Sequence, residues 1–169
     1  MAELSMWLDG YNDIYSDFDA RALPRRRISE DFMHELEAAY RRREEHTDCL
    51  TLQIPAGARI EADEKLITAR LNSHFTLEYE LSLALLKQKT NKNILFFCSS
   101  LLIMATNILI SARESTPGNI SSLRILLEPA GWFFFWNSLE YFIYERQSDL
   151  HKKTFWYKLA GWKILFRSY

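Results

Sequence analysis

One stretch of the chain, residues 94–112, contains nineteen residues and not one charged side chain. At a rise of about 1.5 Å per residue, a helix of this length covers roughly 28 Å, close to the thickness of the hydrocarbon core of a bilayer. Lysines precede the stretch and Arg113 follows it. A core helix of a soluble protein does not need so long an uncharged run, so the stretch predicts a membrane-spanning helix.

A second apolar stretch, residues 124–144, follows a connecting segment at 113–123 that is rich in turn-forming residues. Its many aromatic side chains would need a very large core in a chain of 169 residues. The two stretches together predict a transmembrane helical hairpin with an external turn between the spans. The alternative is a helical hairpin buried in the core of a soluble protein.

Basic residues near the two spans indicate their orientation. Three lysines precede the first span, and six Lys and Arg residues follow the second, whereas the turn carries Arg113, with Arg124 at the edge of the second span. Cytoplasmic segments carry the excess of Lys and Arg in membrane proteins. We therefore expect both termini in the cytoplasm and the turn outside.

Three polar side chains interrupt the second span. Glu128 is expected at its outer edge, where Arg124 lies within reach of an ion pair. Glu140 lies about one turn from the inner end and can snorkel or pair with a basic residue there. Asn137 and Glu140 share one side of the helix, and we expect both to face protein or a water-filled cavity, as functional or assembly residues. Pro129 is expected to start the membrane helix proper.

The first span has a polar face of its own. A helical rotation of about 100° per residue places five residues on one side, namely Ser99, Ser100, Ile103, Thr106 and Asn107. Small and hydroxylated side chains favour close packing of helices in lipid. This face predicts either a contact within the hairpin, or an oligomer interface or polar lumen.

Residues 1–90 and 147–169 predict a small cytoplasmic α/β part that completes a mainly α-helical membrane protein. Residues 49–54 alternate between apolar and polar side chains, as in a half-buried strand. The alternation returns at 162–169, so these two segments can pair. A two-stranded ribbon is marginal in water, and a third strand is expected from residues 4–8 or from a neighbouring subunit.

Helix signals flank these strands. Ser29 is a typical N-cap for the helix that follows it. No Pro or Gly occurs between Gly57 and Pro117, so one helix can run unbroken from Asp63 into the first span, with a bend near residues 90–93 as the alternative. A C-terminal helix is expected to end with Gly161 in the left-handed C′ conformation.

The chain carries few signs of cofactor or metal chemistry. Its five glycines are scattered, so no phosphate-binding loop is formed, and Cys49 and Cys98 are too far apart for a zinc-binding pair. The acidic segment 9–19 lacks the spacing of a calcium loop and is expected to be solvated. We predict no cofactor, no metal and no catalytic residue. A net charge of −1 makes nucleic acid an improbable partner.

The N-terminal segment and the cysteine count bear on the compartment. The acidic first residues lack a basic region followed by an apolar one, so no secretory signal peptide is expected. Two cysteines do not make a disulfide framework and fit a reducing compartment or a membrane.

One short pattern points to a different chemistry. Arg41 and His46 in "RRREEH" have the R-x4-H spacing and resemble the active site of HEPN-type ribonucleases, in which Arg and His flank a scissile phosphate. The usual polar residue after the Arg is Arg42 here. The alternative is a charged helix terminus, which an Arg-rich run produces without any catalytic role.

Two longer segments resemble a known group of proteins. The run "YNDIYSDFDARALPRRRISEDFMHEL" and the run "LLEPAGWFFFWNSLEYFIYE" are similar to an uncharacterised family of small bacterial two-span membrane proteins. In that family a cytoplasmic α/β part brackets a helical hairpin, and a G-W-x-x-x-W motif lies in the second span; here it is Gly131, Trp132 and Trp136. The resemblance implies the bacterial inner membrane and no particular activity.

Three functions fit these patterns. The first is a homo-oligomeric integral membrane protein, such as a pore or membrane-disturbing effector controlled from the cytoplasm. Two helices cannot enclose a channel, so a pore needs several chains. The second is a membrane anchor or scaffold that recruits a cytoplasmic partner protein. The third is a membrane-tethered HEPN-like nuclease.

Overall fold

The computed structural model describes residues 3–43, 47–112 and 118–169, and the side chains of these residues except 24 and 118–124. The described chain is mostly helical and contains a small parallel sheet. It divides into two compact units. The first, called the α/β unit here, comprises Met1–Glu80 and Lys153–Tyr169, and the second, the hairpin unit, comprises Leu81–Lys152.

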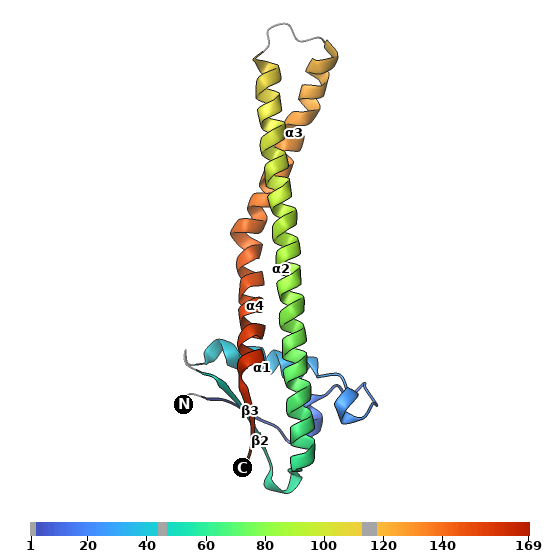
Figure 1. Ribbon diagram of the computed structural model, residues 1–169, viewed down its shortest axis with the longest axis vertical. Coiled ribbons are helices and arrows are strands. Elements are labelled where there is room, and N and C mark those ends of the chain that lie inside the picture. The colour runs from blue at the N-terminus through green and yellow to red at the C-terminus, as the bar shows by residue number, and fades with distance from the viewer. Residues whose placement is uncertain (1–2, 44–46, 113–117) are drawn as a thin grey trace. The chain divides into compact units, whose positions relative to one another are not determined.

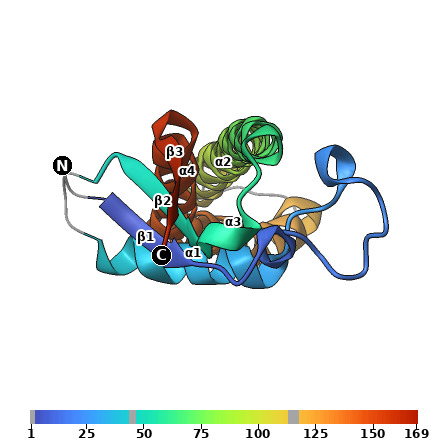
Figure 2. The same cartoon turned by 90° about the horizontal axis from the view of Figure 1, so that it is seen from below.

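The sheet of the α/β unit has three parallel strands in the order β1-β2-β3. Strand β1 is Glu3–Trp7, β2 is Cys49–Ile54 and β3 is Lys163–Ser168. Figure 2 shows β2 between its two neighbours. The predicted pairing of the C-terminal segment with the strand at 49–54 is confirmed, and the third strand comes from the N-terminal residues of the same chain.

Helix α1, Glu30–Arg42, begins where the cap predicts, because the Ser29 hydroxyl accepts a hydrogen bond from the backbone N–H of Phe32. It forms the core of the α/β unit with one face of the sheet and with parts of helices α2, Glu61–Ser111, and α4, Arg146–Gly161. The buried core includes Phe32, Leu36, Leu50, Leu52, Ile54, Ile67, Leu71, Phe75, Phe155 and Leu159.

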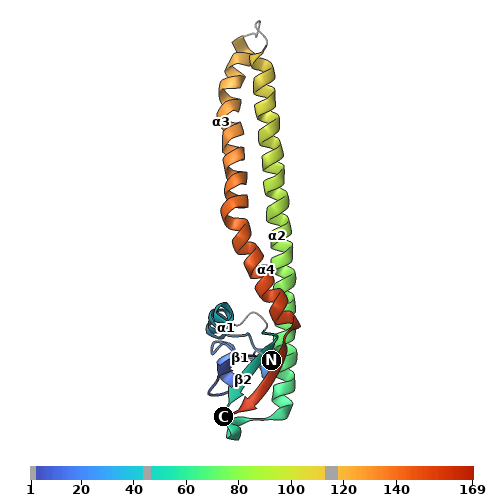
Figure 3. The ribbon, with the colours of Figure 1, turned by 90° about the vertical axis from the view of Figure 1, so that its left-hand side faces the viewer.

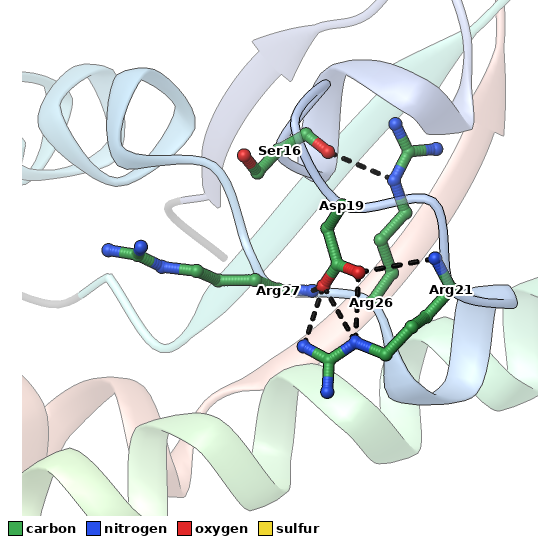
Figure 4. A network of polar contacts seen from close by, with 5 residues as sticks. All are labelled: Ser16, Asp19, Arg21, Arg26 and Arg27. Atoms are coloured by element: carbon green, nitrogen blue, oxygen red, sulfur yellow. Dashed lines mark hydrogen bonds and ion pairs between the residues drawn. The ribbon is translucent and has the colours of Figure 1, made fainter.

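The acidic residues between β1 and α1 are mostly exposed, as at Asp9, Asp13 and Asp17, whereas Asp19 is partly covered. Figure 4 shows the Asp19 carboxylate between two arginines. It accepts hydrogen bonds from Arg21 Nε at 2.8 Å and from the backbone N–H of Arg27 at 2.7 Å. Arg26 Nε donates to the carbonyl of Ser16 at 3.0 Å. The hydrogen bonds from the Arg21 side chain, and then from the Arg27 backbone, hold the pKa of Asp19 well below its usual range.

Helix α2 has 51 residues and no interruption, which confirms the prediction of one unbroken helix from the α/β unit into residues 94–111. Among the described residues it is the one helix that is long and apolar enough to cross a membrane by length and composition. Within its most apolar window only 6% of the residues are buried. A helix in the core of a soluble protein would be mostly buried, and this window of α2 is not buried within the single chain.

Helix α3, Gly118–Glu140, runs alongside α2 in the hairpin unit (Figures 1 and 3). It begins before residue 124, where the second span was expected to start, and Pro129 lies inside it and does not start it. The proline removes one donor, to the carbonyl of Ile125, while the turns on either side keep their hydrogen bonds. The expected external turn is therefore shorter than 113–123.

Helix α4 ends at Gly161, but not in the expected left-handed conformation. No described glycine has a positive φ. The backbone N–H of Trp162 donates to the carbonyl of Leu159 at 3.2 Å, and β3 begins at once with Lys163. Because the strand continues immediately in extended conformation, no left-handed residue is needed to close the helix.

Candidate functional site in the hairpin unit

Small and polar side chains lie between α2 and α3 at seven-residue spacing. Asn93, Ser100 and Asn107 follow one another on α2, and Gly131 and Ser138 do so on α3. Ser100 and Ser138 are fully buried, and Asn93 is 8% exposed. Seven residues make two turns of helices that wind around each other, so each set keeps to one face.

Gly131 sets the distance between the two helices. A Cβ at this position would lie 3.1 Å from Ile103 Cγ2 and 3.4 Å from Met104 Cγ. Trp132 and Trp136, the other members of the G-W-x-x-x-W motif, are 50% and 60% exposed. The motif therefore places its small residue against the neighbouring helix and its large residues outside.

Aromatic rings fill the space beside these small residues. Phe96 packs against Phe134 with ring centroids 5.3 Å apart, and Phe97 against Phe135 at 5.9 Å. Such pairs contribute roughly 0.5–1.5 kcal/mol beyond the area they bury. They fix the register of α3 against α2 on both sides of the small-residue line.

A polar network joins α2 to the segment that follows α3 at the end of the hairpin unit where Lys89 and Thr90 lie. Lys89 Nζ donates to the Asp149 carboxylate at 2.9 Å and lies 3.8 Å from Glu145. The hydroxyls of Thr90 and Tyr141 are hydrogen-bonded at 2.9 Å, and Tyr141 is only 3% exposed. The hydrogen bond from Lys89 to Asp149 raises the pKa of Lys89.

A π-helical turn, Tyr141–Glu145, makes this network possible. In an α-helix of about 100° per residue, Tyr141 and Asp149 would lie about 80° apart around the axis. The wider turn takes up one extra residue, which brings the two side chains to about 20° of each other. Both can then meet α2. Nothing in the sequence "YFIYE" distinguishes a π-turn from an α-turn, so the sequence reasoning missed it.

The polar face predicted for the first span is divided between two environments. Ser100 faces α3 and donates to the carbonyl of Phe97 at 2.7 Å, and Asn107 is half-buried with its Oδ1 out of contact with solvent. Thr106 is exposed and donates to the carbonyl of Leu102 at 2.8 Å, and Ser99 is half-buried. Ser100 and Thr106 thus satisfy their hydroxyls within α2.

The polar residues of α3 lie away from the buried line. Glu128, Asn137 and Glu140 are exposed in the single chain, whereas their neighbours Ser138 and Tyr141 are buried. Glu128 lines an open groove with Asn107 and Trp132. Its predicted pair with Arg124 falls on a side chain outside those that the structure describes. Whether Asn137 and Glu140 face protein, water or lipid stays a prediction, but this chain's own α2 does not cover them.

Of the two residues in the R-x4-H pattern, the structure describes only Arg41. Arg41 is exposed at the end of α1 and forms an ion pair with Glu37 at 2.7 Å, one helical turn earlier. His46 lies outside the described residues. An i, i+4 pair on a helix is the ordinary surface role of such an arginine.

Metal ligands do not gather in the described part of the chain, where no group of three or more His, Cys, Asp or Glu side chains could hold an ion. Cys49 and Cys98 are both free thiols. Comparison of the chain with protein-family models, with curated proteins and with solved structures finds no match. The resemblance to small bacterial two-span membrane proteins therefore stays an expectation.

Proposed function

We propose that this chain is a homo-oligomeric integral membrane protein of the bacterial inner membrane, in which α2 and α3 form a two-span hairpin. Large apolar side chains point outward from both helices and support a lipid environment. Leu102 is 70% exposed, Ile108 68%, Ile125 74% and Phe133 64%. Contact of such an apolar surface with water is unfavourable, whereas contact with lipid is not.

The observation that carries the oligomer is the exposure of Asn137 and Glu140 on the outside of the hairpin. A carboxylate one turn inside a bilayer costs about 2–3 kcal/mol on insertion scales. Snorkelling removes part of that cost, and burial against a second chain or in water removes more. Because α2 does not cover these two residues, the second chain is the natural partner for them.

The packing of a single hairpin leaves no lumen at the line of small residues. Ser100 and Ser138 are fully buried there, and Gly131 lies in contact with Ile103. If the oligomer conducts, its path runs between chains, along the face of α3 that carries Asn137 and Glu140. A pore or membrane-disturbing effector controlled from the cytoplasm is the function that this arrangement supports best.

Native mass spectrometry in mild detergent tests the assembly. We expect a defined oligomer for the parent chain, and loss of that oligomer with normal membrane insertion for the Asn137→Leu/Glu140→Leu double variant. Phe133→Leu/Ile143→Leu is the matched control, because both residues are exposed but apolar. A strictly monomeric parent chain, or a double variant that assembles like the parent, would reject the proposal.

Cysteine labelling tests the topology separately. With Cys49 and Cys98 replaced by serine, a cysteine at Ser115 should react with an impermeant maleimide added to spheroplasts. A cysteine at Lys153 should react only after the membrane is opened. The reverse pattern would overturn the orientation derived from the basic residues.

A membrane anchor that recruits a cytoplasmic protein is the second candidate. It is favoured by the sheet of the α/β unit, whose outward side exposes Trp7, Leu165 and Tyr169. Capture experiments with the full chain in detergent, compared with a Trp7→Ser variant, test this. Failure to retain any specific protein from a cytoplasmic extract would count against it.

A membrane-tethered nuclease is the most distant candidate and rests on the spacing of Arg41 and His46 alone. Incubation of the purified chain with RNA tests it. Cleavage that is absent, or that is unchanged in a His46→Ala variant, would reject it.

A further inference from the structure

An open groove lies between α2 and α3 in the hairpin unit. The residues that line it include Met104, Asn107, Ile108 and Ser111 of α2 and Glu128 and Trp132 of α3. Its volume of about 530 Å³ lies within the range of pockets that hold small organic molecules. Because the groove is formed within one chain, an inference about it does not depend on the proposed oligomer.

The carboxylate of Glu128 is the one charged group among the described residues that line the groove. Among the side chains that the structure describes, none forms a hydrogen bond or an ion pair with it. A carboxylate beside apolar walls such as Met104 and Ile108 is costly without a counter-charge. Glu128 therefore favours a cation in the groove.

The amide of Asn107 adds a hydrogen-bond acceptor to the groove. Asn107 Oδ1 is out of contact with solvent and has no hydrogen-bond partner in the described part of the chain. A buried polar atom without a partner costs free energy, so it marks a position where a donor is expected. Rotation about the soft Cβ–Cγ torsion turns this oxygen toward a donor in the groove. The amide therefore favours a ligand that carries N–H groups.

Trp132 provides an aromatic wall, one helical turn after Glu128. Its ring is 50% exposed, so part of it is open to a ligand. Residues at i and i+4 lie on the same side of a helix, and the face of an indole ring attracts organic cations. Glu128 and Trp132 can therefore hold one cationic group between them.

We propose that the groove binds an organic cation in which a protonated amine is attached to an apolar body. The Glu128 carboxylate pairs with the ammonium group, Asn107 Oδ1 accepts one of its N–H groups, and the ring of Trp132 covers it. Met104 and Ile108 contact the apolar body. Each part of such a ligand meets a side chain of matching chemistry.

The lining residues suit other cationic groups less well. Ca²⁺ takes roughly six to eight oxygen ligands, more than the side chains of Glu128, Asn107 and Ser111 supply. A zwitterionic lipid headgroup would bring a phosphate together with its amine. The described lining residues include no base, so that phosphate would meet the Glu128 carboxylate and no opposite charge. A free amine is therefore the ligand that the groove fits best.

Calorimetric titration of the full chain with hexylammonium tests the site. The chain is kept in a maltoside detergent, because its sugar headgroup carries no amine that could compete. We expect saturable binding of hexylammonium, and binding of hexanol that is weaker by about tenfold or more, because hexanol has the same apolar chain and no charge. Equal affinities for the two probes, or no saturable binding of hexylammonium, would overturn the proposal.

Two pairs of variants identify the side chains that bind the probe. Glu128→Gln should weaken hexylammonium binding by about tenfold or more, because it removes the counter-charge. Glu80→Gln is the matched control, since Glu80 is an exposed carboxyl of α2 that does not line the groove. Trp132→Leu should weaken binding several-fold, whereas Trp136→Leu should not, because Trp136 is 60% exposed on the same helix but lies outside the groove. Equal effects within either pair would contradict the proposal.

A methylated probe, hexyltrimethylammonium, isolates the role of Asn107. It keeps the positive charge of hexylammonium but has no N–H group to donate. Asn107→Leu should therefore weaken hexylammonium binding several-fold and leave the affinity for the methylated probe within about twofold of the parent. Equal weakening of both probes would show that Asn107 acts through packing, and would overturn the assignment of its oxygen to the ammonium group.

Arg124 is the competing source of positive charge, because the sequence predicts its ion pair with Glu128. Its side chain lies outside those that the structure describes. Titration of an Arg124→Gln variant decides between the two cations, and we expect its hexylammonium affinity within about twofold of the parent. A gain of about tenfold would show that Arg124 is the cation of the groove, and would overturn the proposal.

Two further measurements separate this site from lipid binding and from the proposed assembly. Phosphatidylethanolamine added to the micelles should leave hexylammonium binding unchanged. Competition by this lipid that disappears in Glu128→Gln would show that a lipid headgroup is the occupant, and would overturn the choice of a free amine. Native mass spectrometry reports the oligomer independently. A monomer that binds hexylammonium rejects the proposed assembly and supports this site, whereas an oligomer that does not bind it overturns this site alone.

Discussion

The two units of the chain bury opposite kinds of side chain. In the α/β unit the fully buried positions are mainly aliphatic or aromatic, as at Leu50, Leu52 and Phe75. In the hairpin unit Ser100 and Ser138 are fully buried, while Leu102 is 70% exposed. The first unit is ordered by removal of apolar area from water. The second has the pattern of helices that pack through small residues and leave large ones to lipid.

The largest expected effect comes from the same substitution made in both units. Leu52→Ala opens a cavity at a side chain with no solvent exposure and should lower the free energy of unfolding by about 2–5 kcal/mol. Leu102→Ala removes no buried contact and should change it by less than about 0.5 kcal/mol. Thermal unfolding in mild detergent, followed by tryptophan fluorescence, measures both. If both variants lowered the free energy of unfolding equally, the two units would not differ in how they are stabilised.

Gly131→Val tests whether close approach holds the hairpin unit together. The added branches would collide with Ile103, whose own β-branched side chain has little rotamer freedom, and overpacking of this kind costs about 1–3 kcal/mol. Ala105→Val adds the same two γ-methyl groups at an exposed position of α2 and is the control. Far-UV circular dichroism during thermal unfolding should show a loss of stability for Gly131→Val and not for Ala105→Val.

Tyr141→Phe measures the polar network around Lys89 and Thr90 in the hairpin unit. Removal of the hydroxyl leaves Thr90 without this partner, and a lost hydrogen bond between neutral groups costs about 0.5–1.5 kcal/mol. Tyr144→Phe removes a hydroxyl from a ring that is 73% exposed and should be nearly neutral. The same unfolding experiment compares the stabilities of the two variants. A Tyr141→Phe variant as stable as the parent would show that the network contributes little to stability.

The smallest effect concerns pH and belongs to the α/β unit. Burial beside Trp156 lowers the pKa of His74, Glu78 opposes this shift and Arg70 adds to it. Because the folded state binds the proton less readily than the unfolded chain, the contribution is present above about pH 6.5 and is lost as the pH falls below that value. His74→Gln should flatten the stability profile between about pH 7 and pH 5. An unchanged slope would exclude His74 as its source.

Local signals in the sequence predicted the elements of the α/β unit well. Ser29 caps α1, residues 49–54 form the central strand, and the absence of Pro and Gly before Pro117 accompanies one long helix. Each of these depends on neighbours along the chain, so a single sequence contains the information. The parallel direction of β1 and β3 depends on distant segments and was not predicted.

The rotation of the hairpin helices about their axes could not be predicted from a period of 100° per residue. That period groups Thr106 with Ser100, but α2 turns Asn93, Ser100 and Asn107 toward α3 instead. The seven-residue spacing arises because two helices wind around each other. The close contact at Gly131 then leaves Asn137 and Glu140 outside, which depends on a pair of helices and not on either alone.

The π-helical turn at Tyr141–Glu145 has a consequence for changes in chain length. Deletion of one residue between 142 and 145 would let the chain form a regular α-helix, and the residues after the deletion would keep their rotation about the axis, because the π-turn already takes up one extra residue. Asp149 would then still point toward Lys89. Deletion of a second residue would rotate everything after it by about 100° and turn Asp149 away from Lys89, although neither residue had been altered. We therefore expect this segment to accept the loss of one residue between 142 and 145 far more readily than the loss of two.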